Sequence, residues 1–258
     1  MAKISDKNNH VVLAIVAHPD DIEILCAGTL SLLRQKGWQV QMATMTAGDC
    51  GSREHGPEEI SKIRKEEAVK AAAMIDAGYH CLECKDLFIM YDRPTLLKTI
   101  RLIRQLRPEI VLTMSPSCYM IDHEMTSKIV QTACFAAGAV NVNTDDVPPY
   151  FHIPHLYYLD PIEGKDKFGT IITPDFVVDI TTVIDQKKEM LACHESQRKW
   201  LLEHHGMDAY LEAMKKMSAE RGEFVNVKYG EGFRQHLGHA YPQHNLLLKE
   251  LEDFAQVI

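Results

Sequence analysis

An imidazole and three carboxylates lie within the six residues His18–Glu23, which read His-Pro-Asp-Asp-Ile-Glu. The segment directly follows the apolar run Val11–Ala17. Two adjacent aspartates in one loop repel each other unless a cation or hydrogen bonds compensate. Histidine and aspartate are ordinary zinc ligands, and a catalytic zinc site takes three protein ligands and a water. The segment therefore predicts a divalent metal site.

A helix start is the alternative explanation of this segment. Either Asp20 or Asp21 could cap the next helix, where a carboxylate is favoured by the helix dipole. A cap accounts for one carboxylate but leaves the histidine and the second aspartate unexplained. We therefore prefer the metal site.

Asp122-His123 follows another apolar run, Ile110–Ser115. Taken alone, this pair is typical of a helix start. If both apolar runs are parallel strands of one sheet, His123 comes to the same sheet edge as His18 and Asp21. A set of two histidines and one aspartate with an open position is what zinc hydrolysis requires.

The elements that position these residues alternate along the first part of the chain. Continuous apolar strands separated by helical patterns predict a parallel sheet covered on both faces. We expect an α/β protein of one domain over residues 1–258, with a Rossmann-like three-layer αβα sandwich over 11–180 and a mostly helical part over 181–258. The expected strands are Val11–Ala17, Val40–Thr46, His80–Cys84, Ile110–Ser115, Leu156–Leu159 and Phe176–Ile180.

Ligands of such sheets bind beyond the carboxyl ends of the strands. The loops that follow the strands should therefore lie together at one edge of the sheet and surround one ligand site. They are His18–Asp21, Ala47–Glu58, Ser115–His123 and Asp160–Lys165.

Composition excludes several function classes. The 258 residues carry 36 acidic and 28 basic side chains, a net charge of −8, without a run of Lys or Arg, so we expect no nucleic-acid partner. No apolar stretch approaches the ~20 residues that span a bilayer, so we expect no membrane insertion. The polar Met1–His10 lacks the apolar region of a signal peptide, which favours the cytoplasm. The seven cysteines are then expected as reduced thiols.

Four motifs in this order resemble those of the PIG-L/LmbE-like family of zinc-dependent N-acetylglucosaminyl deacetylases. They are Ala17-His18-Pro19-Asp20-Asp21-Ile22-Glu23, Arg64-Lys65-Glu66-Glu67-Ala68, Asp122-His123 and Cys193-His194-Glu195-Ser196-Gln197. The resemblance implies an LmbE-like fold and removal of the N-acetyl group from an N-acetylglucosamine-type sugar or its conjugate.

The resemblance also implies roles for individual residues. His18, Asp21 and His123 match the ligands of about one Zn²⁺ per chain. Asp20 matches the general base that activates the metal-bound water. Arg64 matches an arginine that contacts substrate. Homo-oligomerisation stays open.

Met120 departs from the family pattern. Many members carry a histidine three residues before the third ligand, where it assists as an acid or oxyanion partner. Methionine can do neither. Candidates for the missing group are His194, His239 and Tyr119; otherwise Asp20 performs both proton transfers.

Further residues have weaker signals. Asp49 is a turn residue or an acceptor for a substrate hydroxyl, and Tyr119 could also contact substrate. Glu231–Arg234 and the following His239 predict a loop near the pocket. Adjacent His204 and His205 point in different directions on a helix, so one ion cannot readily use both, and we expect surface or interface residues.

Two other function classes compete with the deacetylase. A non-catalytic binding module would explain Met120, but it would not need Asp20 beside the three ligands. A nucleotide-binding protein is the weakest alternative, because no G-x-G-x-x-G or G-x-x-x-x-G-K-[ST] motif occurs. Among enzymes, hydrolysis of a different small amide stays open.

Overall fold

The structure, a computed structural model, describes residues 10–198 and 209–258. His204 and His205 lie outside these residues. Eight strands form one sheet in the order β3-β2-β1-β4-β5-β7-β6-β8. They are β1 (Val11–Val16), β2 (Gln39–Thr46), β3 (Gly78–Cys84), β4 (Ile110–Thr113), β5 (His155–Leu159), β6 (Phe176–Asp179), β7 (Gly230–Gln235) and β8 (Ala255–Val257).

Strands β1 to β5 are parallel, with β1 between β2 and β4. Ala14 of β1 pairs with Met42 on one side and Leu112 on the other. Every residue of β1 is buried. A strand covered on both faces cannot alternate polar and apolar residues, which explains the continuous apolar run.

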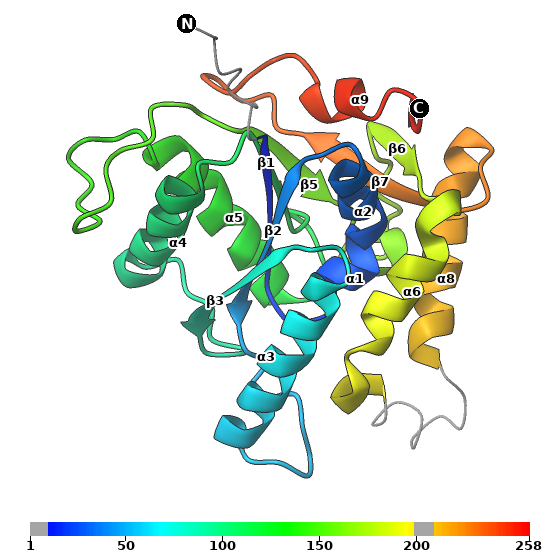
Figure 1. Cartoon of the computed structure of the whole chain (residues 1–258), viewed down its shortest axis with the longest axis horizontal. Coiled ribbons are helices and arrows are strands. Elements are labelled where there is room, and N and C mark those ends of the chain that lie inside the picture. Colours follow the sequence, from blue (N-terminus) through cyan, green and yellow to red (C-terminus); the bar gives the residue numbers. More distant parts are fainter. Residues whose placement is uncertain (1–9, 199–208) are drawn as a thin grey trace, which may run out of the picture.

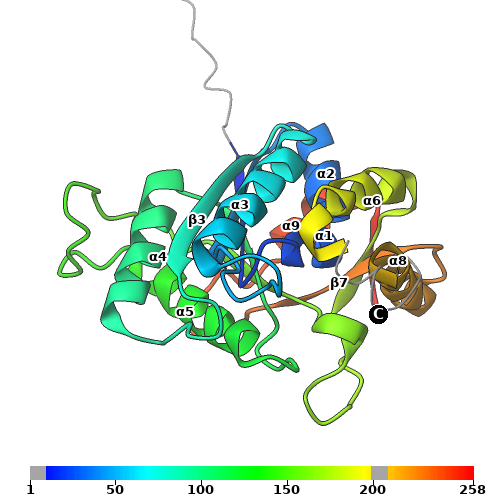
Figure 2. The ribbon, with the colours of Figure 1, turned by 90° about the horizontal axis from the view of Figure 1, so that it is seen from below.

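Helices cover both faces of the sheet, so the expected three layers and mostly parallel sheet are confirmed (Figures 1 and 2). On one face lie α4 (Arg93–Leu106) and α5 (Ile121–Ala136), which pack on the side chains of Leu13 and Ile15. On the other lie α1 (Asp21–Leu25), α2 (Ala27–Gln35), α3 (Pro57–Ala73), α6 (Ile184–Ala192), α8 (Ala209–Gly222) and α9 (Leu246–Glu250). Single 3₁₀ turns are η1 (Ile162–Gly164), η2 (Thr181–Val183) and η3 (Glu223–Val225).

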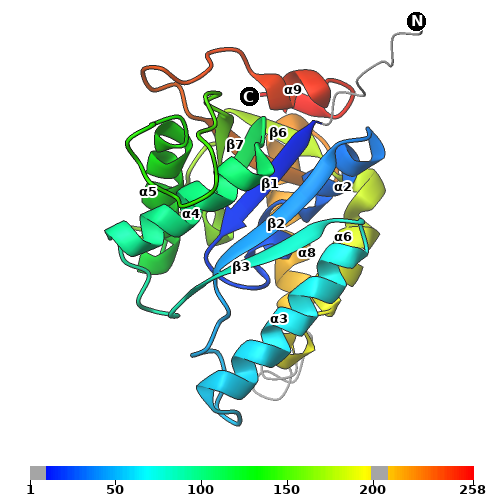
Figure 3. The same cartoon turned by 60° about the vertical axis from the view of Figure 1, so that its left-hand side comes forward.

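The part of the chain after residue 180 contains helices α6, α8 and α9, and it also contributes two strands, β7 and β8, to the sheet. β7 lies between β5 and β6 and runs antiparallel to both (Figure 3). The predicted loop at Glu231–Arg234 is therefore a central strand. Its glycines and charges have low strand propensity, and pairing with two neighbouring strands overrides that preference.

Glu231 explains how a charged residue is accommodated in this strand. Its carboxylate accepts a 2.6 Å hydrogen bond from Lys187 Nζ on α6. It also accepts bonds from the backbone N–H groups of Gly28 and Thr29, at 2.9 and 2.7 Å, in the first turn of α2. The buried carboxylate thus joins β7, α6 and the N-terminus of α2, where a negative charge is favoured.

Two expectations from composition can be compared with the structure. All seven cysteines are free. Within residues 10–198 and 209–258, no helix has the length and apolarity that crossing a bilayer would require.

Candidate metal and catalytic site

The predicted metal ligands meet beyond the carboxyl ends of β1 and β4. His18 Nδ1 lies 3.3 Å from Asp21 Oδ2, and His123 Nε2 lies 3.6 Å from Asp21 Oδ1. One donor atom from each residue falls within 4.8 Å of the others, and all three residues are buried. The structure therefore brings together the trio that the sequence predicted.

Neighbouring groups fix the orientation of these side chains. The backbone N–H of His18 donates a 2.8 Å hydrogen bond to Asp21 Oδ2. His123 Nδ1 lies 3.1 Å from the Cys118 thiol, so its Nε2 is the nitrogen that faces Asp21. Partners that hold the far side of a ligating imidazole set its ring orientation.

Two more buried carboxylates surround His18. Its Nε2 lies 3.1 Å from Asp86 Oδ1 and 3.5 Å from Asp122 Oδ2. Sequence reasoning missed Asp86, which follows β3. The signal was available, because the predicted strand His80–Cys84 brings its following loop to the same sheet edge.

The buried carboxylates of the cluster favour a positive charge among them. Burial acts to lower the pKa of His18, but bonds to Asp122, Asp21 and Asp86 outweigh it and raise this pKa well above its usual value. Burial alone would raise the pKa of Asp21, yet His123 and His18 lower it to about 2. The carboxylates thus stabilise positive charge between them.

The donor set fits a divalent metal ion. Burial lowers the pKa of His123, which favours the neutral imidazole that metals require. Among the described residues, His18 Nε2 and Asp122 Oδ1 are buried without a hydrogen-bond partner of good geometry. Buried polar atoms are normally paired, so unpaired ones beside a ligand trio indicate a site for an ion and its second shell.

Asp20 lies beside this trio with a constrained backbone. Its φ of 103° is in the left-handed region, which non-glycine residues rarely adopt. Tyr210 OH donates a 2.5 Å hydrogen bond to Asp20 Oδ2, and Arg64 Nη2 lies 3.4 Å from Oδ1. Arg64 Nη2 also donates a 2.6 Å bond to the carbonyl of Pro19. The carboxylate is therefore held from two sides.

Burial raises the pKa of Asp20, although Arg64 and Tyr210 act in the opposite direction. A carboxylate with a raised pKa is a stronger proton acceptor than an exposed one. Burial and the neighbouring Asp20 also raise the pKa of Tyr210 well above its usual value. Tyr210 is thus a neutral donor facing a carboxylate acceptor.

A cavity of about 530 Å³ opens onto these groups. Its volume lies within the ~300–1,000 Å³ of small-molecule sites. The lining includes the metal trio and Asp20 together with Cys50, Arg64, Asp86, Tyr119, Met120, Ile162, Gln197 and Tyr210. The site combines a metal-ligand set, an oriented carboxylate and room for a small molecule.

The family model described as GlcNAc-PI de-N-acetylase (PIG-L) matches residues 13–134. This segment is a PIG-L domain match, as the sequence motifs predicted. The match spans β1 to α5, the segment that supplies the metal trio and Asp20.

Relatives of this chain are named for more than one reaction. It is 29% identical to a diacetylchitobiose deacetylase of Thermococcus kodakarensis, over 90% of this chain and 86% of the relative. It is 24% identical to a 4-oxalmesaconate hydratase of Pseudomonas putida, over 86% of this chain and 87% of that protein. The structure of an N,N'-diacetylchitobiose deacetylase from Pyrococcus horikoshii superimposes with a TM-score of 0.77 at 25% identity, covering 93% of this chain and 90% of the other.

The remaining predicted site residues lie in different places. Arg64 and Tyr119 line the cavity, and the Tyr119 ring stands edge-on to His123 with centroids 5.4 Å apart. Asp49 instead accepts a 2.8 Å bond from the backbone N–H of Asp86, so it braces the loop after β3. Asp49 is not among the residues that line the cavity.

His194 is fully buried behind the cavity. Its Nε2 lies 3.3 Å from Glu23 Oε2 on α1. Burial acts to lower the pKa of His194, and the charge and hydrogen bond of Glu23 more than offset this and raise it. The pair packs under the Asp20 loop and does not reach the cavity lining.

His239 lies at the opposite edge of the sheet. β7 is antiparallel to β5, and the backbone N–H of His236, just after β7, donates a 2.9 Å bond to the carbonyl of Leu156 near the start of β5. The chain after β7 is therefore at the amino ends of the parallel strands, where Gln235 bonds to the carbonyls of Pro242 and His244. His239 is not among the residues that line the metal cavity, and its catalytic role stays a prediction.

Tyr210 is the site residue that the sequence could not supply. It lies 190 positions after Asp20 and belongs to no motif. Its only signal was membership of an aromatic-rich C-terminal part. The contact depends on how α8 packs against α1, which the local sequence does not specify.

Proposed function

We propose that this protein is a metal-dependent N-deacetylase. It would hydrolyse the amide of an N-acetylglucosamine-type sugar or its conjugate to acetate and the free amine. The observation that carries the proposal is the oriented Asp20 carboxylate beside the His18, Asp21 and His123 trio in one cavity. The deacetylases among its relatives support the choice of reaction and substrate class.

His18, Asp21 and His123 would hold about one Zn²⁺ per chain. When bound, the ion acts as a Lewis acid on the amide carbonyl and makes water a stronger nucleophile. Asp86 and Asp122 would orient His18 through its Nε2.

Asp20 would move the proton. Its carboxylate accepts a proton from the attacking water as the new C–O bond forms. It then returns this proton to the nitrogen as the C–N bond breaks, so that the amine leaves neutral. Tyr210 and Arg64 keep the carboxylate in place during both transfers.

Met120 makes this double role necessary. It occupies the cavity at the position where many relatives have a histidine, and the imidazoles lining the described cavity are the two metal ligands. Burial raises the pKa of Tyr119 to about 12, so this hydroxyl stays protonated and could donate a hydrogen bond to substrate. Arg64 Nε, buried without a partner of good geometry among the described residues, is a second donor at the cavity wall.

The first test measures zinc by elemental analysis and acetate release from N-acetylglucosamine and diacetylchitobiose. Native protein should bind about one zinc per chain and release acetate, and His123→Ala should lose the metal. Asp20→Asn should keep the metal and lose activity by at least about a hundredfold, the usual contribution of a general base.

Asp185→Asn is the matched control, because Asp185 is exposed on α6 and far from the cavity lining. It should retain both metal and activity. Full activity of Asp20→Asn would overturn the mechanism. Metal binding without hydrolysis of these two sugars or of any other N-acylated glucosamine tested below would overturn the deacetylase. Hydration, the reaction named for the Pseudomonas putida relative, would then be tested next.

A further inference from the structure

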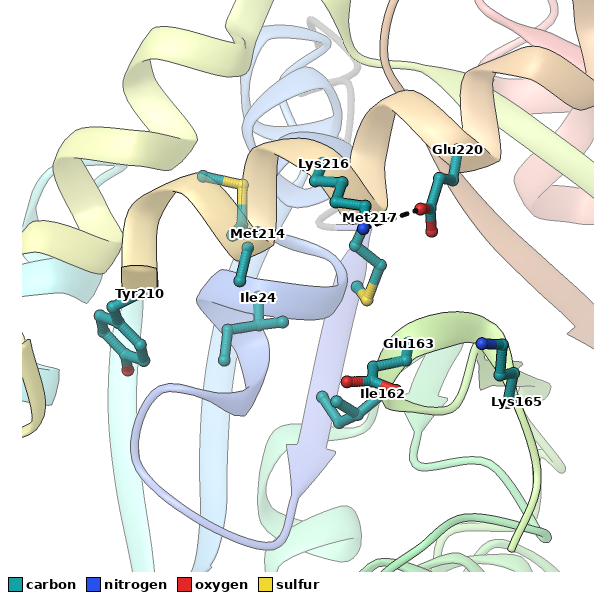
Figure 4. Close-up of a pocket in the computed structure, with 10 residues that line it drawn as sticks. Ile24, Ile162, Glu163, Lys165, Tyr210, Met214, Lys216, Met217 and Glu220 are labelled. Carbon is teal, nitrogen blue, oxygen red and sulfur yellow. Dashed lines mark ion pairs between the residues drawn. The ribbon is translucent and has the colours of Figure 1, made fainter. Parts of the chain in front are cut away.

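A second recess opens beside the metal cavity, between α1, η1 and α8 (Figure 4). Its volume is about 330 Å³. Ile24 of α1, Ile162 of η1 and Met217 of α8 point toward one another across it, and Met214 of α8 also lines it. Ile24 and Met217 pack against the hydrophobic core without being fully covered, so the recess is apolar and open.

The recess is continuous with the metal cavity. Ile24, Ile162 and Tyr210 line both. Tyr210 is the residue whose hydroxyl bonds to Asp20, so the recess begins one side chain away from the proposed base. A substrate with its amide at Asp20 would therefore project a further group past the Tyr210 ring into the recess.

The charges at the rim are balanced. Lys216 and Glu220 lie 3.8 Å apart on α8, one turn from each other; Lys216 is exposed and Glu220 is half-buried. Lys165 and Glu163 of the η1 segment add one charge of each sign. Balanced charge at the rim offers no net attraction to a strongly anionic or cationic group, whereas the methionines and isoleucines favour an apolar one.

The walls of the recess are fixed before any ligand arrives. Arg221 of α8 donates a 3.1 Å bond to the carbonyl of Ile172 and approaches Asp160 at 3.3 Å, both in the segment that carries η1. Gly164 has a φ of +65°, and a side chain there would collide with Arg221. Lys167 anchors the same segment to α5 through two 2.9 Å bonds to Glu124. A preformed site loses little free energy to ordering.

We propose that this recess binds an apolar group of the substrate, attached either to the sugar or to the acyl carbon. The proposal rests on the proposed function and narrows its substrate class to conjugates with an apolar extension. The shared chemistry is a short hydrocarbon or aromatic group, which would be buried against Met217 and Ile162.

Two substrate pairs distinguish the two attachments. The first is the methyl and hexyl β-glycosides of N-acetylglucosamine, and the second is N-acetyl- and N-hexanoylglucosamine. We expect the longer member of one pair to have a kcat/KM at least about tenfold higher, mainly through a lower KM. Equal values within both pairs would overturn the proposal.

Variants of Met217 test whether the higher kcat/KM for the longer substrate depends on the recess. Met217→Glu places a charge on the apolar wall and should remove the advantage of the longer substrate. Its hydrolysis of the methyl glycoside should stay within about twofold of the native rate. Met217→Leu keeps the apolar wall and should retain the advantage. An undiminished advantage in Met217→Glu, with native zinc content and melting temperature, would assign the preference elsewhere and refute the recess.

Binding without turnover separates this proposal from the proposed function. Hexyl β-glucoside carries no amide, so its binding by calorimetry does not depend on deacetylation. If no N-acyl sugar is hydrolysed but hexyl β-glucoside binds native protein and not Met217→Glu, the recess is supported and the deacetylase is not. Absence of binding to native protein would overturn the recess even if deacetylation is found.

Discussion

The buried pair of Lys187 and Glu231 makes a quantitative prediction about stability. Both side chains are 1% exposed, and Lys187 Nζ lies 2.6 Å from Glu231 Oε1. The same carboxylate accepts the N–H groups of Gly28 and Thr29 at the start of α2. The change to test is Lys187→Met, which keeps the length of the side chain and removes its charge.

The expected loss follows from what remains around the carboxylate. Breaking a buried ion pair by removing one partner costs about 3–5 kcal/mol, because the other charge is left buried. In Lys187→Met, two backbone bonds and the α2 N-terminus still stabilise Glu231. We therefore expect the lower end, about 3 kcal/mol. At about 2–4 °C per kcal/mol for a domain near this size, the melting temperature should fall by about 6–12 °C.

Urea unfolding followed by circular dichroism, at fixed zinc concentration, measures the change in free energy. Glu231→Gln alone should lower the free energy of unfolding more than Lys187→Met does. It leaves the buried ammonium of Lys187 without a counter-charge and weakens the acceptor for the N–H groups of α2. The double variant should be more stable than the sum of the single losses predicts, since neither charge is then unpaired.

Lys188→Met is the control, because Lys188 is the next residue of the same helix and forms no ion pair with any described residue. It should change stability by no more than about 0.5 kcal/mol. If Lys187→Met lowers the free energy of unfolding by less than about 1 kcal/mol, the ion pair does not hold β7 to α2 and the reasoning is refuted.

Three further predictions concern the site and pH. Tyr210→Phe removes the hydrogen bond to Asp20 and should lower kcat by about tenfold to a hundredfold at unchanged zinc content, the equivalent of about 1.5–3 kcal/mol. An unchanged kcat would show that Arg64 alone positions the base. Met120→His supplies the missing imidazole and should raise kcat by about tenfold or more, whereas no gain would mean that Asp20 already performs both transfers without loss. Burial and the neighbouring His244 lower the pKa of His155, so folding favours its neutral form and the free energy of unfolding decreases as the pH falls below 6.5. The urea midpoints at about pH 7.5 and 5.5 should therefore differ less in His155→Asn than in native protein. An equal difference in both proteins would contradict this assignment.

The metal centre was predictable from the sequence because its parts lie in short motifs. His18 and Asp21 share one loop, and the rule that ligands bind at the carboxyl ends of parallel strands joins His123 to them. Asp86 was missed because neither of its neighbours in the sequence is a histidine or a second carboxylate.

The residues supplied by the C-terminal part were not predictable in the same way. Tyr210 reaches Asp20 through helix packing, which depends on the whole fold. The position of His239 depends on the direction of β7, the strand that precedes it. A strand that runs antiparallel sends its following loop to the opposite edge, and the sequence of β7 gave no sign of a strand.

The contact between Tyr210 and Asp20 also determines the order in which the site can form during synthesis. All three metal ligands lie within residues 18–123: His18 follows β1, Asp21 begins α1, and His123 lies in the first turn of α5. The tyrosine and the strand that holds α8 in place come last along the chain. A ribosome adds residues at about 5–20 per second, so the ligands emerge several seconds before Tyr210. The metal can therefore act as an early folding ligand, while the orientation of the base waits for the last third of the chain.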